Sequence, residues 1–429
     1  MDDVVVVGGG PAGAFIAWAL VGAGVRVRLL DRAHFPRDKP CSEYLSPEAA
    51  RLLDAMGVLQ AIEGAGAARL AGMRVRAANG TAIQGDFSAD HGYRAYRDHG
   101  LALRRTALDA ILLDRARVAG ARVHEGVQVV DLMRDRRGTV TGAVTRGANG
   151  TRTQIPARLV IGADGLRSVV AARLGVARRA RFPRRVAIVT HYDSVREMSA
   201  YGEMHVAADG YLGLAPVGGG LTNVAVVVPA GIMRRWPGDP PSLVADRIAR
   251  DPLVAARFAG ARRATPVRAT GPFASRALRA WAPGAALVGD AADFYDPFTG
   301  EGMFAAMRGG ELLAPFVHAA LEAPNERAAC DALREYDAAR SRAFSGKWQV
   351  ERLIAIAVGS PPVLNGAVRA MRQRKSLADL LVGVAGDFVP ASAVLSLPFA
   401  LTMLALALAP RSLSQSGARA DAPVSPTEA

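Results

Sequence analysis

The chain has 429 residues, half of them apolar and 21% charged, and its formal net charge is +14. This composition excludes a disordered protein, and the length allows two domains, or one large domain with a second embedded in it. Two cysteines, Cys41 and Cys330, are too few for a disulfide scaffold or a four-cysteine metal site. The motifs H-E-x-x-H, G-x-x-x-x-G-K and G-x-S-x-G are absent, so we expect no metal site and no hydrolase.

The positive charge is not concentrated in one basic segment. Only Lys39, Lys347 and Lys375 are Lys, and the many Arg residues are scattered, which is typical of solvated surfaces. We therefore expect no nucleic-acid partner. Low cysteine usage fits a reducing compartment, and a strand that begins at Asp3 leaves no room for a signal peptide, so a cytoplasmic location is expected.

The first unit of the chain has the pattern strand, glycine-rich turn, helix, strand and acid. The first glycine allows a tight turn, the second lets a pyrophosphate approach the backbone, and the third lets the helix pack on the strand. The second strand, predicted over Val25–Leu30, is followed by a carboxylate suited to ribose hydroxyls, so FAD or NAD is expected. We assign to this cofactor site Gly8, Gly10, Ala12, Gly13, Asp31 and Arg32.

Two later stretches repeat part of this plan. Residues Arg158–Gly175 predict a strand, an Asp164-Gly165 turn and a helix. Residues Ala285–Pro315 predict a strand, Gly289-Asp290, a Pro/Gly loop and a small-residue helix. Each stretch places an aspartate at the carboxyl end of a strand, where an open α/β sheet binds its ligand.

With these motifs the sequence resembles the FAD-dependent hydroxylase superfamily, which also contains the geranylgeranyl reductases. Members share the N-terminal G-x-G-x-x-G, a central D-G segment, and a C-terminal G-D followed by P-x-x-G-x-G, here Pro297, Gly300 and Gly302. The resemblance covers about Asp3 to Ala320 in order and spacing. It implies that the dinucleotide is FAD, and because no second dinucleotide fold remains, NAD(P)H would bind transiently in the same cleft as electron donor.

The resemblance also implies individual roles. Asp290, after Gly289, would bind the ribityl or phosphate part of FAD, and Asp164 would lie by the pyrophosphate. The helix start after Pro297, with Gly300, Gly302 and Met303, would present backbone N–H groups to the flavin pyrimidine. Arg105 matches an R-x-x-L-D helix start that reaches the FAD phosphates, and Arg104 is the rival for that role.

The expected fold class is α/β, with a Rossmann-like FAD-binding domain, an inserted and mainly antiparallel β-sheet domain for substrate, and a C-terminal helical segment. The FAD-binding domain is predicted in three pieces, residues 1–72, 101–175 and 271–320. Period-2 patterns assign residues 73–100 and 176–270 to the substrate sheet. Residues 321–410 are expected to be helical and partly apolar, and residues 411–429 to form a disordered tail.

Residues Phe388–Pro410 carry no charge. Pro390 and Pro398 interrupt this segment, which leaves too short a run for an ordinary membrane-spanning helix. The segment can lie on a membrane or line an apolar entrance, pack in the core or a dimer contact, or span a bilayer. We favour the first alternative, in which peripheral membrane contact through residues 388–410 or an apolar entrance is expected. Four basic residues that flank it could touch anionic lipid, namely Arg372, Arg374, Lys375 and Arg411.

The reaction type is left open between two branches. The loop Lys39–Pro47 resembles the Lys-x-Cys loop of the geranylgeranyl reductases, Glu301 gives their G-E-G, and Asp293 stands where many hydroxylases have His. Against this, prenyl reductases usually carry an aromatic strand that here has Gly213 and Ala215 in place of two large aromatics. The resulting wider pocket suits a bulky aromatic or polyketide-like molecule, so we lean toward an NAD(P)H-dependent monooxygenase acting on a lipophilic small molecule.

Catalytic candidates follow from each alternative. A monooxygenase needs a base to ionise a phenolic substrate, for which His191 and Tyr211 on the predicted sheet are candidates beside Tyr192 and His205. A reductase that saturates a C=C bond needs a proton donor, for which Cys41, or its neighbours Ser42 and Glu43, could serve. A flavoprotein dehydrogenase that passes electrons to quinone, and a non-catalytic FAD-binding protein, remain further alternatives.

Overall fold

The computed structural model describes residues 2–147, 150–179, 184–294 and 296–409. Its central sheet has the strand order β20-β21-β11-β1-β2-β8, and β1, β2, β8, β11 and β21 run parallel. The strands are β1 Asp2–Val7, β2 Val27–Leu30, β8 Arg122–His124, β11 Arg152–Gly162, β20 Trp281–Ala282 and β21 Ala285–Leu287. Runs of Val and Leu fill the inner strands because both faces of the sheet are covered.

Helices cover this sheet, with α1 packed against both α4 and α9. Their bounds are α1 Pro11–Gly22, α4 Arg105–Ala119 and α9 Gly302–Glu322. The second strand begins at Val27, two residues later than predicted, because the N–H of Val25 still bonds to the carbonyl of Leu20 at the end of α1. Near the edge of the domain, β11 continues into an antiparallel ladder with β10 Val140–Arg146 and β9 Gln128–Arg134.

A second large sheet has the strand order β17-β13-β16-β15-β14-β5-β6, with β18 against β13. Its pairs are antiparallel except for β14 with β5. The strands are β5 Gly72–Arg76, β6 Ala82–Asp86, β13 Arg185–Asp193, β14 Tyr201–Ala207, β15 Gly210–Pro216, β16 Leu221–Pro229, β17 Arg262–Arg263 and β18 Arg268–Thr270. This is the inserted sheet that the period-2 patterns predict, and we call it the roof sheet.

The roof sheet has two apolar faces because alternate side chains point to opposite sides. One face, which includes Ile188, Leu212 and Val226, packs in a cluster with Leu243 and Val254 of short helices. The other face looks toward the FAD-type domain, as the next subsection describes. The outer helices are α6 Ala230–Arg235, α7 Pro240–Ala249 and α8 Pro252–Arg257.

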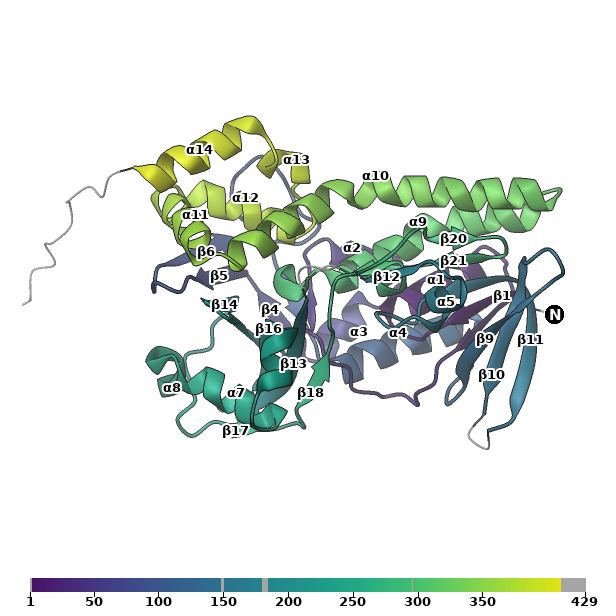
Figure 1. Ribbon diagram of the computed structural model, residues 1–429, viewed down its shortest axis with the longest axis horizontal. Helices are drawn as coiled ribbons and strands as arrows, with labels where there is room; N and C mark the ends of the chain where they lie inside the picture. The colour runs from purple at the N-terminus through teal and green to yellow at the C-terminus, as the bar shows by residue number, and fades with distance from the viewer. Residues whose placement is uncertain (1, 148–149, 180–183, 295, 410–429) are drawn as a thin grey trace, which may run out of the picture.

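The C-terminal third is helical and lies along one side of both sheets (Figure 1). Helix α10 is the longest, and α11 to α14 gather over the end of the molecule beside β5 and β6. Their bounds are α10 Glu326–Val358, α11 Pro361–Gln373, α12 Lys375–Ala385, α13 Ala391–Val394 and α14 Leu397–Leu408. The predicted tail, 411–429, lies outside the described residues.

Within the described ranges, a single helix that is both long and apolar enough to cross a membrane is not found. The pair α10 and α11 passes that test together, but it is bent by 112°. The remaining short elements are α2 Ala49–Ala55, α3 Leu59–Gly64, α5 Val169–Arg173, β3 Tyr44–Leu45, β4 Ala68–Leu70, β7 Gly100–Ala102, β12 Ala177–Arg179, β19 Ser275–Ala277, β22 Asp293–Phe294, and the 3₁₀ turns η1 Gly289–Ala291 and η2 Pro297–Thr299.

Candidate functional site

Each of the three motif glycines after β1, Gly8, Gly10 and Gly13, is a glycine for its own physical reason. Gly8 has φ +103°, and a Cβ there would lie 2.5 Å from the carbonyl oxygen of Ala163. A Cβ on Gly13 would lie 1.8 Å from the carbonyl oxygen of Gly8, so these two glycines are required by packing. A Cβ on Gly10 would meet nothing closer than the Nη2 of Arg37 at 3.5 Å. Gly10 therefore keeps open space in front of the helix N-terminus.

Buried and half-buried cations surround that open space. Arg105 and Arg37 share one carboxylate, Asp109, with N–O distances of 2.7 and 3.1 Å. Lys39 has no hydrogen bond or ion pair within the described residues, and burial, with Arg105 and Arg37 nearby, lowers the pKa of its ammonium group. Uncompensated positive charge at a helix N-terminus fits a diphosphate, so these residues fit the pyrophosphate of a dinucleotide.

Asp31 and Arg32 differ in how far they are exposed. Asp31 is buried, and its two oxygens accept from the N–H groups of Gly9 and Ala33 at 2.7 and 2.8 Å. It therefore fixes the glycine turn itself. Arg32 is exposed and is not among the residues that line the cavity. Arg37, which the sequence analysis did not assign, lies beside Gly10, since a Cβ on Gly10 would lie 3.5 Å from Arg37 Nη2. Its guanidinium is thus placed where a cation could bind the phosphates.

Asp164 precedes α5 and accepts hydrogen bonds at the start of that helix. Its carboxylate accepts from the Ser168 hydroxyl at 2.6 Å and from the N–H of Val169 at 2.6 Å at the start of α5. Burial raises its pKa, and these hydrogen bonds lower it in part. The Asp164 side chain does not line the cavity, whereas its neighbour Gly165 does. A Cβ on Gly165 would lie 3.5 Å from Lys39 Nζ.

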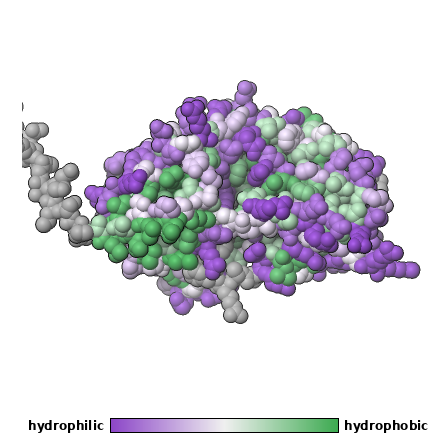
Figure 2. Space-filling view, turned by 90° about the horizontal axis from the view of Figure 1, so that it is seen from above, coloured by the Kyte–Doolittle hydropathy of each residue, from purple (hydrophilic) through white to green (hydrophobic). Residues whose placement is uncertain are grey.

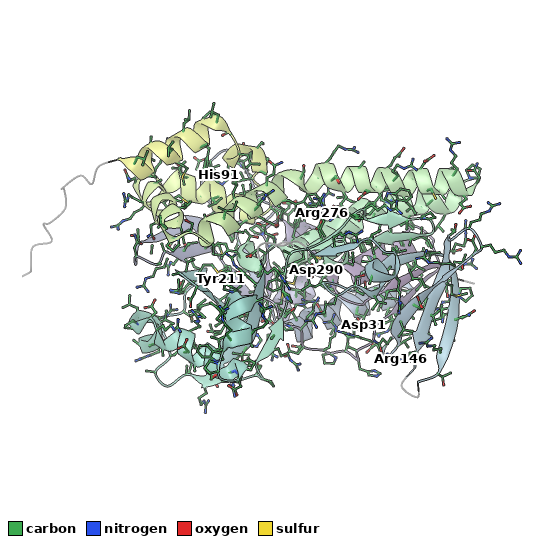
Figure 3. All side chains as sticks on the ribbon, viewed as in Figure 1. Asp31, His91, Arg146, Tyr211, Arg276 and Asp290 are labelled. Carbon is green, nitrogen blue, oxygen red and sulfur yellow. The ribbon has the colours of Figure 1, made fainter. Side chains whose placement is uncertain are left out.

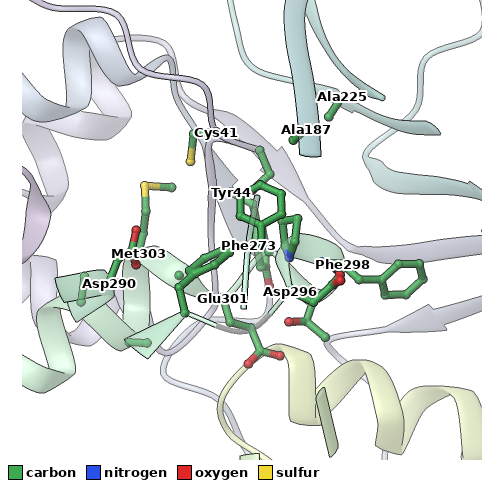
Figure 4. A pocket seen from close by; sticks show the side chains of 18 of the residues that line it. Cys41, Tyr44, Ala187, Ala225, Phe273, Asp290, Asp296, Phe298, Glu301 and Met303 are labelled. Carbon is green, nitrogen blue, oxygen red and sulfur yellow. Dashed lines mark hydrogen bonds between the residues drawn. The ribbon is translucent and has the colours of Figure 1, made fainter. Parts of the chain in front are cut away.

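Asp290 and the start of α9 form the far wall of the same cavity, where Asp290 and Met303 lie together opposite Cys41 (Figure 4). Burial raises the pKa of Asp290, although Lys39 opposes that shift. Gly300 has φ +74°, and a Cβ there would lie 3.0 Å from the Tyr44 ring. The 3₁₀ turn at Pro297 and the helix start at Gly302 thus present backbone to the cavity, as the predicted flavin contact requires.

The cavity continues without a break under the roof sheet. Tyr211 and Asp290 lie between the two sheets in Figure 3, and Ala187 and Ala225 close the cavity from above in Figure 4. Strand alternation explains much of the lining, because every second residue in the middle of β13 and β16 faces the cavity. These positions hold small or flexible apolar side chains, including Ala187, Val189, Met204, Gly213, Ala225 and Val227.

His191 has the same strand parity as Ala187 and Val189, yet it is not among the lining residues. Both of its ring nitrogens are engaged, Nε2 with Glu43 Oε2 at 2.6 Å and Nδ1 with Thr265 Oγ1 at 2.9 Å. Glu43 Oε2 also accepts from Asn223 Nδ2 at 3.0 Å. His191 is thus covered by the loop that carries Glu43, and the structure gives it no free nitrogen toward a substrate.

Tyr211 and Cys41 do line the cavity. The Tyr211 hydroxyl donates to Asp296 Oδ1 at 3.2 Å, and Asp296 also pairs with Arg185 at 2.8 Å. Burial raises the pKa of Tyr211 well above 10, so it does not act as a phenolate at neutral pH. Cys41 is held through its carbonyl, which accepts from Asn223 Nδ2 at 2.9 Å.

Helix α10 adds charged side chains that the sequence reasoning did not assign. Lys347 pairs with Glu301 at 2.5 Å and with Asp387, and Arg340 pairs with Asp293. Glu351, one turn after Lys347, lines the cavity but has no hydrogen bond or ion pair in the described part of the chain. Burial raises the pKa of Glu351 to about 8. Its spacing of eleven and four residues from Arg340 and Lys347, which places the three side chains on one face of a helix, was the available sequence signal.

Comparisons with known proteins agree with this geometry. A family model described as an FAD binding domain matches residues 1–350. The menaquinone reductase of Mycobacterium tuberculosis is 36% identical over 174 residues, so that this match spans only 40% of either protein. The menaquinone reductase of Mycolicibacterium smegmatis is 30% identical over 406 residues, which are 90% of this chain and 92% of that protein.

Two further comparisons extend over most of the chain. Digeranylgeranylglycerophospholipid reductase 2 of Methanopyrus kandleri is 29% identical and covers 75% of this chain and 78% of its own. Among solved structures, a flavoprotein/dehydrogenase from Cytophaga hutchinsonii superposes with a TM-score of 0.79 at 22% identity, over 94% of this chain and 98% of its own. At that identity the structural match establishes the fold alone.

Proposed function

The chain belongs to the family that carries this FAD binding domain and is an FAD-dependent oxidoreductase, and from this premise we propose that it reduces a carbon–carbon double bond in a lipophilic substrate of isoprenoid type. The observation that carries the proposal is an unpaired acid in an apolar cavity that is continuous with the cofactor site. Of the acids that line it, Glu203, Asp293, Asp296 and Glu301 are paired with cations, whereas Asp290 and Glu351 have no ion pair among the described residues.

The residues would divide the work as follows. When bound, reduced FAD supplies a hydride to one carbon of the double bond. Glu351, protonated at neutral pH, supplies the proton to the other carbon and regains it from solvent. The apolar wall under the roof sheet holds the substrate and excludes water. NAD(P)H, bound transiently in the same cleft, is our proposed source of electrons.

The sequence relatives support this choice of substrate class. The names of the M. smegmatis and M. kandleri proteins refer to reduction of menaquinone and of a digeranylgeranyl glycerophospholipid. For this chain, the Lys39–Pro47 loop and Glu301 are the features that resemble the geranylgeranyl reductases. Both border the cavity, since Lys39, Cys41 and Glu301 line it.

A monooxygenase that hydroxylates an aromatic or polyketide-like molecule is the second candidate. It is favoured by Gly213 and Ala215, which line the roof where a prenyl reductase usually has aromatics and so leave a wide cavity. It is less well supported because the expected bases are engaged. His191 is held by Glu43, and His205 is paired with Glu203 at 2.9 Å.

The test distinguishes the two reactions by the mass of the product. Full-length protein with FAD, reduced anaerobically by NADH or NADPH, is incubated with a menaquinone and with a geranylgeranyl lipid in detergent. We expect the isoprenoid chain to gain two hydrogens per double bond without oxygen, and this gain should persist after any quinol ring has been reoxidised in air. A product that gains one oxygen atom, formed only in air, would instead assign the monooxygenase. If the quinone oxidises NAD(P)H while the isoprenoid chains of both substrates keep all their double bonds, the protein is a dehydrogenase.

A matched pair of variants tests the proton donor. Glu351→Gln should lower the rate of double-bond reduction by at least about tenfold, because a general acid contributes roughly 10² or more. Glu335→Gln changes an exposed acid of the same helix and should leave the rate unchanged. Bound flavin should be equal in both proteins, and an unaltered rate in Glu351→Gln would refute the assigned role.

A further inference from the structure

The solvent face of α14 is apolar along its whole length. Leu397, Leu401, Leu404 and Leu408 are 70, 56, 56 and 73% exposed. Their spacing of four, three and four residues places them on one face of the helix. The other exposed positions of α14 are Pro398, Ala400 and Ala405, so this face carries no polar side chain. Figure 2 shows the resulting apolar patch at the end of the molecule where α14 lies.

The opposite face of α14 is well anchored. Phe399, Met403 and Leu406 pack against a core cluster that includes Val368 and Met371 of α11. Two side chains of α11 also hold the end of the helix, because Arg369 Nη1 and Gln373 Nε2 donate to the carbonyls of Ala407 and Leu406 at 3.4 and 2.9 Å. The leucines are therefore held outward by a packed inner face, and their exposure is a fixed property of the fold.

Positive charge borders this apolar face. Residues 352–378 contain five basic side chains and no acid, and residues 388–409 contain no charge. In α11 and the residue that follows it, Arg372 and Arg374 are exposed and have no ion pair within the described ranges. An apolar helix face next to unpaired cations has the chemistry of a surface that binds anionic lipid.

We propose that the α14 face, defined as Leu397, Leu401, Leu404 and Leu408 with the bordering cations of α11, docks on the surface of an anionic lipid bilayer. The four leucines would enter the boundary between headgroups and acyl chains, and Arg372 and Arg374 would contact lipid phosphates. A membrane is favoured over the chain's own C-terminal end as occupant. Residues 410–429 contain only two large apolar side chains, Leu413 and Val424, too few to cover this face.

The docking surface is independent of the reaction, because none of its residues lines the cavity. It goes beyond the proposed function and would hold equally for a reductase or a monooxygenase. It would also hold the substrate domain and the cofactor domain together on one side of the lipid headgroups.

The experiment is cosedimentation of the full-length, flavin-loaded protein with two kinds of vesicle, phosphatidylcholine alone and phosphatidylcholine with phosphatidylglycerol. The test variant is L401Q/L404Q. The matched control is L253Q/L278Q, which changes two leucines, each 65% exposed, on other parts of the surface. Flavin content and melting temperature are measured for every protein, so that a folding defect is recognised.

We expect the wild type and the control to bind the anionic vesicles, and L401Q/L404Q to bind at least about tenfold more weakly. R372Q/R374Q should lose most of the preference for anionic vesicles, because each cation near the surface contributes to binding. If the wild type binds neither vesicle, or L401Q/L404Q binds as well as the wild type, the proposal is wrong. A vesicle-independent dimer that L401Q/L404Q abolishes would assign the face to a second copy and also overturn it.

Discussion

Glu43 Oε2 lies 2.6 Å from His191 Nε2, and the contact joins the FAD-binding domain to the roof sheet across 148 residues of sequence. Both side chains are buried, at 1 and 3% exposed. Glu43 also accepts from the backbone N–H of Arg105 at 2.9 Å, at the start of α4. One carboxylate therefore joins the start of α4, the loop that carries Cys41, and strand β13 of the roof sheet.

This relationship predicts a large stability effect for Glu43→Ala. The change leaves buried donors on Arg105, Asn223 and His191 without their acceptor. We expect the free energy of unfolding to fall by about 2–4 kcal/mol, measured by urea denaturation. Glu63→Ala, which removes a weaker, partly exposed partner of Arg97, should cost less than about 1 kcal/mol. Equal effects of the two changes on the free energy of unfolding would show that the buried hydrogen bonds of Glu43 do not stabilise the fold more than an exposed ion pair does.

The glycine turn predicts different outcomes for two similar changes. Gly10→Val should fold but bind FAD at least about tenfold more weakly, because its side chain has room in the protein and occupies the space for the phosphates. Gly13→Val should fail to fold, because its Cβ would lie 1.8 Å from the Gly8 carbonyl oxygen. Visible absorbance of flavin and circular dichroism check both. A folded Gly10→Val protein with full flavin content would contradict the assignment of this site.

Lys39 predicts a pH effect in the protein stripped of FAD. Burial lowers the pKa of Lys39 below its usual 10.5, so the unfolded chain binds more protons than the folded one between the two values. The free energy of unfolding should therefore rise with pH through this range because of Lys39. Lys39→Met removes the effect and should also weaken FAD binding. We would compare urea denaturation of both flavin-free proteins at neutral and alkaline pH, and parallel curves would rule out the assigned effect.

Local patterns of the sequence were sufficient for much of the fold. The glycine turn after β1 and the strands β13 to β16 follow from residue spacing and alternation alone, and both occur as predicted. His191 was a candidate only as a residue of the predicted sheet, and in the structure it shares the strand parity of the cavity-lining Ala187 and Val189. Its cover comes from Glu43, on a loop distant in sequence, and nothing in the β13 pattern could reveal that contact.

The charged side chains of α10 show the same limit. The helix was expected, but its role as a cavity wall depends on how it packs against α9 and the η2 turn, which are tertiary contacts. Lys347, one of only three lysines, was noted for its rarity alone, and its partners Glu301 and Asp387 lie 46 and 40 residues away in sequence. Asp31 was predicted as a ribose ligand from its place after β2, and in this structure both its oxygens accept backbone N–H groups.

Glu351 predicts a pH dependence that joins stability to activity. Its pKa is about 8 in the folded chain and 4.5 as its ordinary value, so folding takes up a proton between these pH values. The free energy of unfolding should therefore fall as pH rises from 4.5 to 8, by at most about 1.4 kcal/mol per pH unit from this group. Glu351→Gln stays neutral and should remove that contribution, whereas Glu335→Gln should keep it.

The same titration should appear in the reaction. If Glu351 donates the proton, the rate of double-bond reduction should be constant below about pH 8 and fall tenfold per pH unit above it, because only the protonated acid can act. Glu351→Gln should show a low rate without that decline. We would measure single-turnover reoxidation of the flavin by substrate without oxygen across this range. A wild-type decline that persists unchanged in Glu351→Gln would assign the proton to another group of the cavity, of which Asp290 is the next unpaired acid.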